Sequence, residues 1–187
     1  MQNKHPIGLK TLFFTEMWER MSYYGMRGIL VLFMTASINN GGLDFSNASA
    51  SAIYGIYAAA VYLMALPGGW LADNIFGQQK TILFGGIVIM FGHLSLAIPN
   101  MTFFYLGLIL VVMGTGLLKP NISAIVGGLY EKNPSMKESG FTIFYMSINI
   151  GSMLGFAVCG YLGERIGWHW GFGAAGIGML FGVIQFV

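Results

Sequence analysis

Charged side chains are scarce in this sequence. Only 9% of its 187 residues are Asp, Glu, Lys or Arg, whereas 56% are hydrophobic. A soluble domain carries about 25% charged residues. A soluble chain of this length could not bury so much apolar surface in one core. The composition therefore excludes an ordinary soluble domain and predicts an all-α integral membrane protein.

Cysteines and metal-binding patterns are also nearly missing. The single Cys159 lies in an apolar run, which excludes a disulfide within the chain. No pair of His, Cys or Asp residues has the spacing of metal ligands, and no nucleophile–base pair is visible. We therefore expect no metal, no cofactor, no nucleic-acid partner and no enzymatic activity.

Long apolar segments, in contrast, fill the chain. A helix that spans a membrane needs about 20 mostly apolar residues, and six segments qualify: about 11–38, 49–74, 79–98, 102–130, 139–163 and 169–187. Lys119-Pro120 interrupts the fourth segment, where the proline should bend the helix. Because the last segment is still apolar at Val187, we expect residues 1–187 to form one six-helix bundle of a longer protein.

The basic residues between these segments and at their ends predict an orientation. If the six helices alternate in direction, one side of the membrane carries Lys4, Lys10, Lys80, Lys132 and Lys137, and the other carries only Arg165. Cytoplasmic loops have an excess of Lys and Arg. We therefore expect a cytoplasmic N-terminus, in a protein of the bacterial cytoplasmic (inner) membrane.

The first segment is unusual because it carries the ionisable residues Glu16, Glu19, Arg20 and Arg27. At about 100° per residue, positions 16, 20, 23 and 27 share one face of a helix. Each charge near the bilayer centre costs about 2.5–3.5 kcal/mol, so this face should point into the bundle interior or a water-filled cavity. A purely structural role, in which Glu16 and Arg20 pair to hold the bundle together, is the alternative.

Lys119 adds a third base at membrane depth. Together, Arg20, Arg27 and Lys119 outnumber the two intramembrane glutamates by one charge, and a spare positive charge attracts an anionic substrate group. Arginine binds carboxylates in bidentate geometry, whereas lysine acts as a point charge. A proton on one glutamate would raise this excess of positive charge and strengthen the attraction for an anion. The pattern therefore predicts coupling between protons and an anionic substrate.

Four sequence motifs identify a family. EMWERMSYYG, residues 16–25, resembles the ExxERFxYYG signature of proton-dependent oligopeptide transporters, with Met21 in place of the usual Phe. GGWLADNIFGQQKTILFGG, from Gly68, resembles the family's version of the major facilitator loop between helices 2 and 3. FTIFYMSINIGSM, from Phe141, resembles the helix 5 signature, and Lys119 in GTGLLKPN is similar to the helix 4 lysine. The motifs stand in the family's order and cover essentially the whole chain.

The resemblance implies a fold and a function. The fold is the major facilitator fold, in which two six-helix bundles enclose a substrate cavity and work by alternating access. The chain would be the N-terminal bundle, and its partner the C-terminal six-helix bundle of the same protein. The implied activity is symport of di- and tripeptides with protons. A proton-coupled transporter of another small anion such as nitrate, and a peptide sensor that does not transport, are the alternatives.

The resemblance also implies roles for single residues. Glu16, Glu19, Arg20 and Lys119 are similar to the family's proton-coupling residues, and which glutamate carries the proton stays open. The residues similar to the family's peptide site are Arg27 and Lys119 for the carboxylate, Asn149 for the amino end or backbone, and Tyr24, Tyr62 and Tyr145 for the side-chain pockets.

Two other sites are of interest. Asp73 and Lys80 resemble the general facilitator motif and imply a conformational latch, although that motif usually has more arginines than this chain has there. His93 lies alone in the third apolar segment. For His93 we expect packing with a satisfied hydrogen bond rather than a role in proton transfer.

Overall fold

The computed structural model of the chain describes residues 4–187, and within this range it is helical and contains no strand. The six long helices are α1 Ile7–Thr35, α2 Asn47–Leu71, α3 Gln78–Leu96, α4 Met101–Gly128, α5 Lys137–Arg165 and α6 Trp168–Phe186. Short helical turns occupy three connections: η1 Ile38–Asn40, η2 Ala72–Phe76 and η3 Pro134–Met136. The six predicted helices are thus confirmed, with ends shifted by a few residues.

The largest shift is at the start of α1, which begins one turn before the predicted apolar segment. Pro6 is its N-cap residue, and the Leu9 N–H donates to the Pro6 carbonyl at 3.0 Å. A proline at a helix start loses no hydrogen bond, because the first N–H groups of a helix have no intrahelical partner. Pro6 can therefore stand at the helix start without cost, and α1 begins before the predicted apolar segment.

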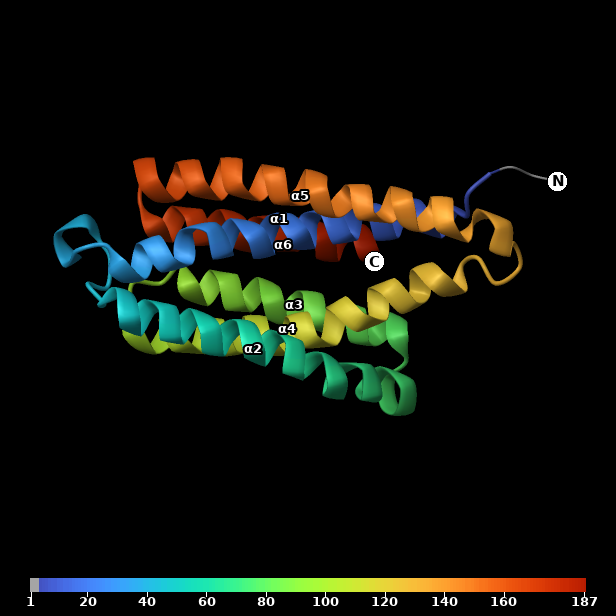
Figure 1. The fold of residues 1–187 in the computed structure, drawn as a ribbon, viewed down its shortest axis with the longest axis horizontal. Coiled ribbons are helices and arrows are strands. Elements are labelled where there is room, and N and C mark those ends of the chain that lie inside the picture. The colour runs from blue at the N-terminus through green and yellow to red at the C-terminus, as the bar shows by residue number, and fades with distance from the viewer. Residues whose placement is uncertain (1–3) are drawn as a thin grey trace.

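The helices form two groups of three. In Figure 1, α1, α5 and α6 lie together in one layer, and α2, α3 and α4 lie together in the other. Within these groups α1 packs on α5 and α6, and α4 packs on α2 and α3, while α3 and α6 join the groups. The place of α1 in one group matches that of α4 in the other, as two three-helix repeats would produce.

The helices differ in how far they are buried. Asn47–Phe76, Gln78–Leu96, Met101–Gly128 and Pro134–Arg165 are each long and apolar enough to cross a membrane. Only 17% of the most apolar window of α2 is buried inside the structure, so its surface can face lipid or another bundle. Helix α1, which carries the charges, buries more than half of its residues. The charged part of α1 is therefore largely enclosed by protein, although its sequence is less apolar than that of the other helices.

Glycines bring α1 and α5 into close contact. The two helices run in parallel, and a Cβ added to Gly155 would meet the Met21 carbonyl oxygen and the backbone of Gly25. A Cβ added to Gly151 would lie 2.9 Å from the Cβ of Arg20. Small residues permit this approach between helices in a membrane, and here they hold α5 at the level of Arg20.

The two ends of the bundle carry different connections. Figure 1 shows the start of α1, the α2–α3 connection and the α4–α5 connection at one end, and the remaining connections at the opposite end. The first end therefore gathers Lys4, Lys10, Lys80, Lys132 and Lys137, while Arg165 lies at the other. Five of these six basic residues therefore lie at one end of the bundle, as the alternation of the helices predicted.

Candidate functional site

The centre of the candidate site is an ion cluster on α1. The Nε of Arg20 lies 2.9 Å from Oε1 of Glu16, one helical turn away, and Arg20 also forms an ion pair with Glu19. All three residues are at most 3% exposed. Two carboxylates thus share one guanidinium in a buried environment, where an unbalanced charge is costly.

Hydrogen bonding in this cluster is incomplete. Glu16 Oε2, Glu19 Oε1 and Arg20 Nη2 are buried and have no hydrogen-bond partner among residues 4–187. An unsatisfied buried polar atom costs free energy, more so when it is charged. A proton on one carboxylate, or a second cation near it, would recover part of that free energy. The cluster is therefore chemically suited to exchange a proton.

Tyr23 separates the ion cluster from a second cation. The Cζ of Arg20 lies 5.3 Å from the centroid of the Tyr23 ring, and the Cζ of Arg27 lies 5.5 Å from the same centroid. Both distances allow cation–π attraction. Glu16, Arg20, Tyr23 and Arg27 therefore form one continuous row along α1, as the helical spacing predicted.

Arg27 is held by a residue that the sequence reasoning missed. Its Nε donates to the Tyr54 hydroxyl at 2.7 Å, and its Nη2 contacts the same oxygen. Tyr54 belongs to α2, so this bond links the two groups of helices. Tyr54 precedes Tyr62 by slightly more than two helical turns, and this spacing is the signal that could have found it.

Lys119 lies against an aromatic ring on α2. Its Nζ is 5.0 Å from the centroid of Tyr62, and both residues retain some exposure. Within residues 4–187, no carboxylate lies within ion-pair distance of Lys119. The structure thus pairs Lys119 with a predicted substrate-site tyrosine rather than with Glu16 or Glu19.

Asn121 sets the position of this part of α4. It is 3% exposed, and its Nδ2 donates to the Leu117 carbonyl at 2.7 Å and to the Gly68 carbonyl of α2 at 3.3 Å. The neighbouring Pro120 lacks an N–H, which weakens the helix at this point. Asn121 therefore fixes α4 to α2 beside Lys119, a contact that the sequence did not reveal.

The remaining predicted substrate residues lie on α1 and α5. Tyr24 is half-buried, with its ring centroid 6.2 Å from that of Phe156. Tyr145 is 54% exposed and Asn149 is also exposed. Across the described range, no hydrogen bond joins either side chain to Arg27 or Lys119. These residues are available at the protein surface, and their contribution to binding stays a prediction.

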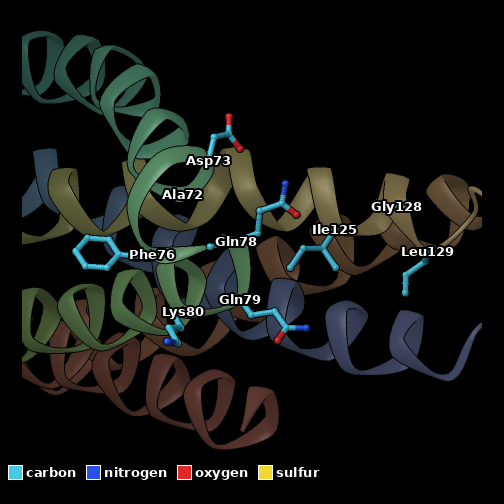
Figure 2. Close-up of a pocket in the computed structure, with 10 residues that line it drawn as sticks. Ala72, Asp73, Phe76, Gln78, Gln79, Lys80, Ile125, Gly128 and Leu129 are labelled. Carbon is cyan, nitrogen blue, oxygen red and sulfur yellow. The ribbon is translucent and has the colours of Figure 1, made fainter.

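Asp73 and Lys80 lie at the end of the bundle that gathers the lysines. They line a cavity of about 630 Å³ between the α2–α3 connection and the end of α4. Figure 2 shows that their side chains do not point toward one another, and no ion pair joins them. Both are exposed. Any latch would therefore use them separately, and that role stays a prediction.

The expectation of a satisfied hydrogen bond for His93 is wrong. His93 is fully buried, and neither ring nitrogen has a hydrogen-bond partner among the residues that the structure describes. The physical reason is that the neighbouring helices bury His93 without bringing a polar partner within reach of its ring, which helix periodicity alone cannot reveal. As a separate point, no group of three or more His, Cys, Asp or Glu residues in the described range could hold a metal ion.

Comparison with known families gives the chain its classification. Residues 79–187 match the model of the POT family. The chain belongs to the POT family. The match covers more than half of the chain and includes the α4 lysine and the α5 signature, while the charged face of α1 lies outside it.

Similar POT-family proteins include several named transporters. The chain is 52% identical over 183 residues to an uncharacterized transporter, YclF, of Bacillus subtilis, and 48% identical over 185 residues to the peptide transporter YePEPT of Yersinia enterocolitica. It is 47% identical over 184 residues to a di-/tripeptide transporter of Lactococcus lactis. Each alignment includes 97% of this chain but only 36–37% of the relative. The chain thus spans little more than a third of the length of the curated relatives it matches.

Solved POT structures share this arrangement of helices. A crystal structure of the peptide transporter POT in complex with sulfate matches 100% of the chain and 38% of its own length, with a TM-score of 0.95 and 48% identity. A POT family transporter in complex with 5-aminolevulinic acid matches with a TM-score of 0.92 and 39% identity, over 99% of this chain and 38% of its own. The chain therefore folds like the corresponding part of these transporters of the major facilitator type, as the motifs predicted.

Proposed function

We propose that the full protein carries short peptides across the membrane together with protons, and that residues 1–187 supply its N-terminal six-helix bundle. The observation that carries this proposal is the buried ion cluster of Glu16, Glu19 and Arg20, with Arg27 farther along the face of α1 that carries Glu16 and Arg20. A proton acceptor and an anion-binding cation are thereby placed within a few helical turns of each other. The names of the relatives support a peptide as the substrate.

The charges supply a physical route for coupling. Two carboxylates share the Arg20 guanidinium, so a proton on one of them leaves Arg20 fully neutralised by the other. The cluster then gains one positive charge, and the attraction of Arg27 and Lys119 for a carboxylate increases. Release of the proton reverses this change. Proton binding and peptide binding would in this way favour one another, as linkage requires.

The rest of the peptide would be held by weaker contacts. Tyr24, Tyr62 and Tyr145 offer an apolar ring with a polar tip, which suits variable side chains. Asn149 offers an amide to the peptide backbone or amino end. The C-terminal bundle would close the site from the other side and supply a carboxylate for the peptide ammonium group.

The orientation belongs to the same proposal. The lysine-rich end of the bundle would face the cytoplasm, because short loops rich in Lys and Arg stay on that side. The N-terminus would then be cytoplasmic, in the bacterial cytoplasmic (inner) membrane. Asp73 and Lys80 would lie at the cytoplasmic end, where closing of the two bundles requires a contact between them.

Uptake of labelled dialanine into proteoliposomes containing the full-length protein tests this function. We expect accumulation when the outside is acidic, and loss of accumulation when a protonophore collapses the gradient. Competition by di- and tripeptides, with none by nitrate, would support a peptide carrier. Competition by nitrate would instead support the anion carrier, and binding of dialanine without any uptake would support a sensor.

A further inference from the structure

We propose that Tyr54 is a positioning residue that orients Arg27 so that one edge of its guanidinium remains open for the carboxylate of the substrate. This inference deepens the proposed function and rests on it. It starts from the contact between Arg27 and the Tyr54 hydroxyl, at 2.7 Å from Nε.

The geometry of the contact selects one edge of the guanidinium. The Tyr54 oxygen contacts both Nε and Nη2 of Arg27, and these two nitrogens form the side edge of the planar group. A hydroxyl there acts as an acceptor, because arginine has only donors. The end edge, formed by Nη1 and the second hydrogen of Nη2, is not used by this contact. It is the edge that can grip a carboxylate with two parallel hydrogen bonds.

The tyrosine proton adds a third donor. Since the Tyr54 oxygen accepts from Arg27, its own hydrogen is free to point elsewhere. No other hydrogen bond of the Tyr54 hydroxyl exists among residues 4–187. Arg27 and Tyr54 are both half-buried, so the pair is partly accessible to a ligand. Together they present a cluster of donors without an acceptor, which suits an anion.

The surroundings prevent Arg27 from turning away. The Tyr23 and Tyr54 ring centroids lie 5.5 Å and 5.1 Å from its Cζ, on α1 and α2 respectively. No carboxylate within the described chain lies within ion-pair distance of Arg27. Its charge is therefore held in place by neutral groups and is not cancelled. A site for an exchangeable anion needs such an arrangement, whereas a purely structural arginine is usually paired with an acid.

The test compares Tyr54→Phe with Tyr161→Phe in the full-length protein. Phenylalanine keeps the ring beside the guanidinium and removes only the hydroxyl. Tyr161, 65% exposed on α5, controls for loss of a tyrosine hydroxyl elsewhere. Equilibrium binding of dialanine and of dialanine amide, which lacks the carboxylate, is measured for each variant by calorimetry, together with thermal unfolding.

We expect Tyr54→Phe to weaken binding of dialanine about tenfold, the usual order for losing one charge-assisted hydrogen bond, and to leave binding of the amide nearly unchanged. The preference for the carboxylate over the amide would therefore shrink, while Tyr161→Phe would keep it. An unchanged preference, or equal weakening for both ligands, would overturn the inference. So would a wild-type protein that binds dialanine no better than its amide.

Binding and transport separate the two proposals. If wild-type protein binds dialanine but shows no gradient-driven uptake, the proposed symport fails, and the Tyr54 inference is still decided by the ratio of the two affinities. If uptake is driven by protons but the ratio does not change in Tyr54→Phe, the proposed function stands and Tyr54 has no positioning role.

Discussion

Gly68 of α2 and Gly116 of α4 touch backbone to backbone. A Cβ added to Gly68 would overlap the Gly116 carbonyl, and one added to Gly116 would lie 2.6 Å from the Met64 carbonyl oxygen. Asn121 donates to the Gly68 carbonyl at the same crossing. The position of Lys119 relative to Tyr62 therefore depends on two residues that have no side chain.

The first prediction concerns this crossing. Gly68→Ala should lower stability by about 1–3 kcal/mol, because the added methyl group must push α4 away. Gly69→Ala is the matched control, since a Cβ there meets nothing within 4 Å, and alanine is favourable in a helix. Thermal unfolding of the two purified variants decides the matter. Equal melting temperatures would mean that α2 and α4 can move apart at this crossing at little cost in stability.

The second prediction concerns the shared guanidinium. Glu19→Gln removes one carboxylate charge and leaves the pair between Glu16 and Arg20, at 2.9 Å, in place. Gradient-driven uptake of dialanine should fall at least about tenfold, which corresponds to about 1.4 kcal/mol. Exchange of external for internal dialanine, which needs no net proton movement, should persist.

Glu16→Gln, measured in the same way, tells the two glutamates apart. The variant that keeps exchange but loses gradient-driven uptake identifies the residue that carries the proton. Full gradient-driven uptake in both variants would contradict a role of the cluster in coupling.

The third prediction concerns Lys119. Lys119→Ala should abolish proton-driven uptake, because it removes the cation that lies 5.0 Å from the Tyr62 ring and helps attract the substrate carboxylate. Lys132→Ala, in the exposed α4–α5 connection, serves as the control for loss of a lysine. Normal uptake by Lys119→Ala would refute the assigned role.

The fourth prediction concerns the latch. Asp73→Asn should reduce the maximal rate of uptake more than it changes the KM for dialanine, because Asp73 lies at the end of the bundle and not among the substrate residues. Asp44→Asn, in the connection at the opposite end, tests whether any loss of a loop carboxylate has this effect. A raised KM with an unchanged maximal rate would place Asp73 in substrate binding instead.

The sequence alone was sufficient for properties that depend on local spacing and composition. The lengths of the apolar segments predicted the six helices, because a segment that crosses lipid must satisfy its backbone hydrogen bonds within itself. The 3.6-residue period placed Glu16, Arg20, Tyr23 and Arg27 on one face, because a helix turns by a constant angle. Alternation of helices placed the lysines of separate connections at one end.

Only the tertiary structure decided which side chains of different helices meet. Arg27 donates a hydrogen bond to Tyr54, Asn121 donates one to Gly68, and His93 has no hydrogen-bond partner among residues 4–187. These outcomes depend on which helices are neighbours and on how far each is shifted along its axis relative to the next. That shift is set by backbone contacts such as Gly68 with Gly116. Glycine leaves no apolar or charged pattern in a sequence, so the contacts that arrange the site could not be read from it.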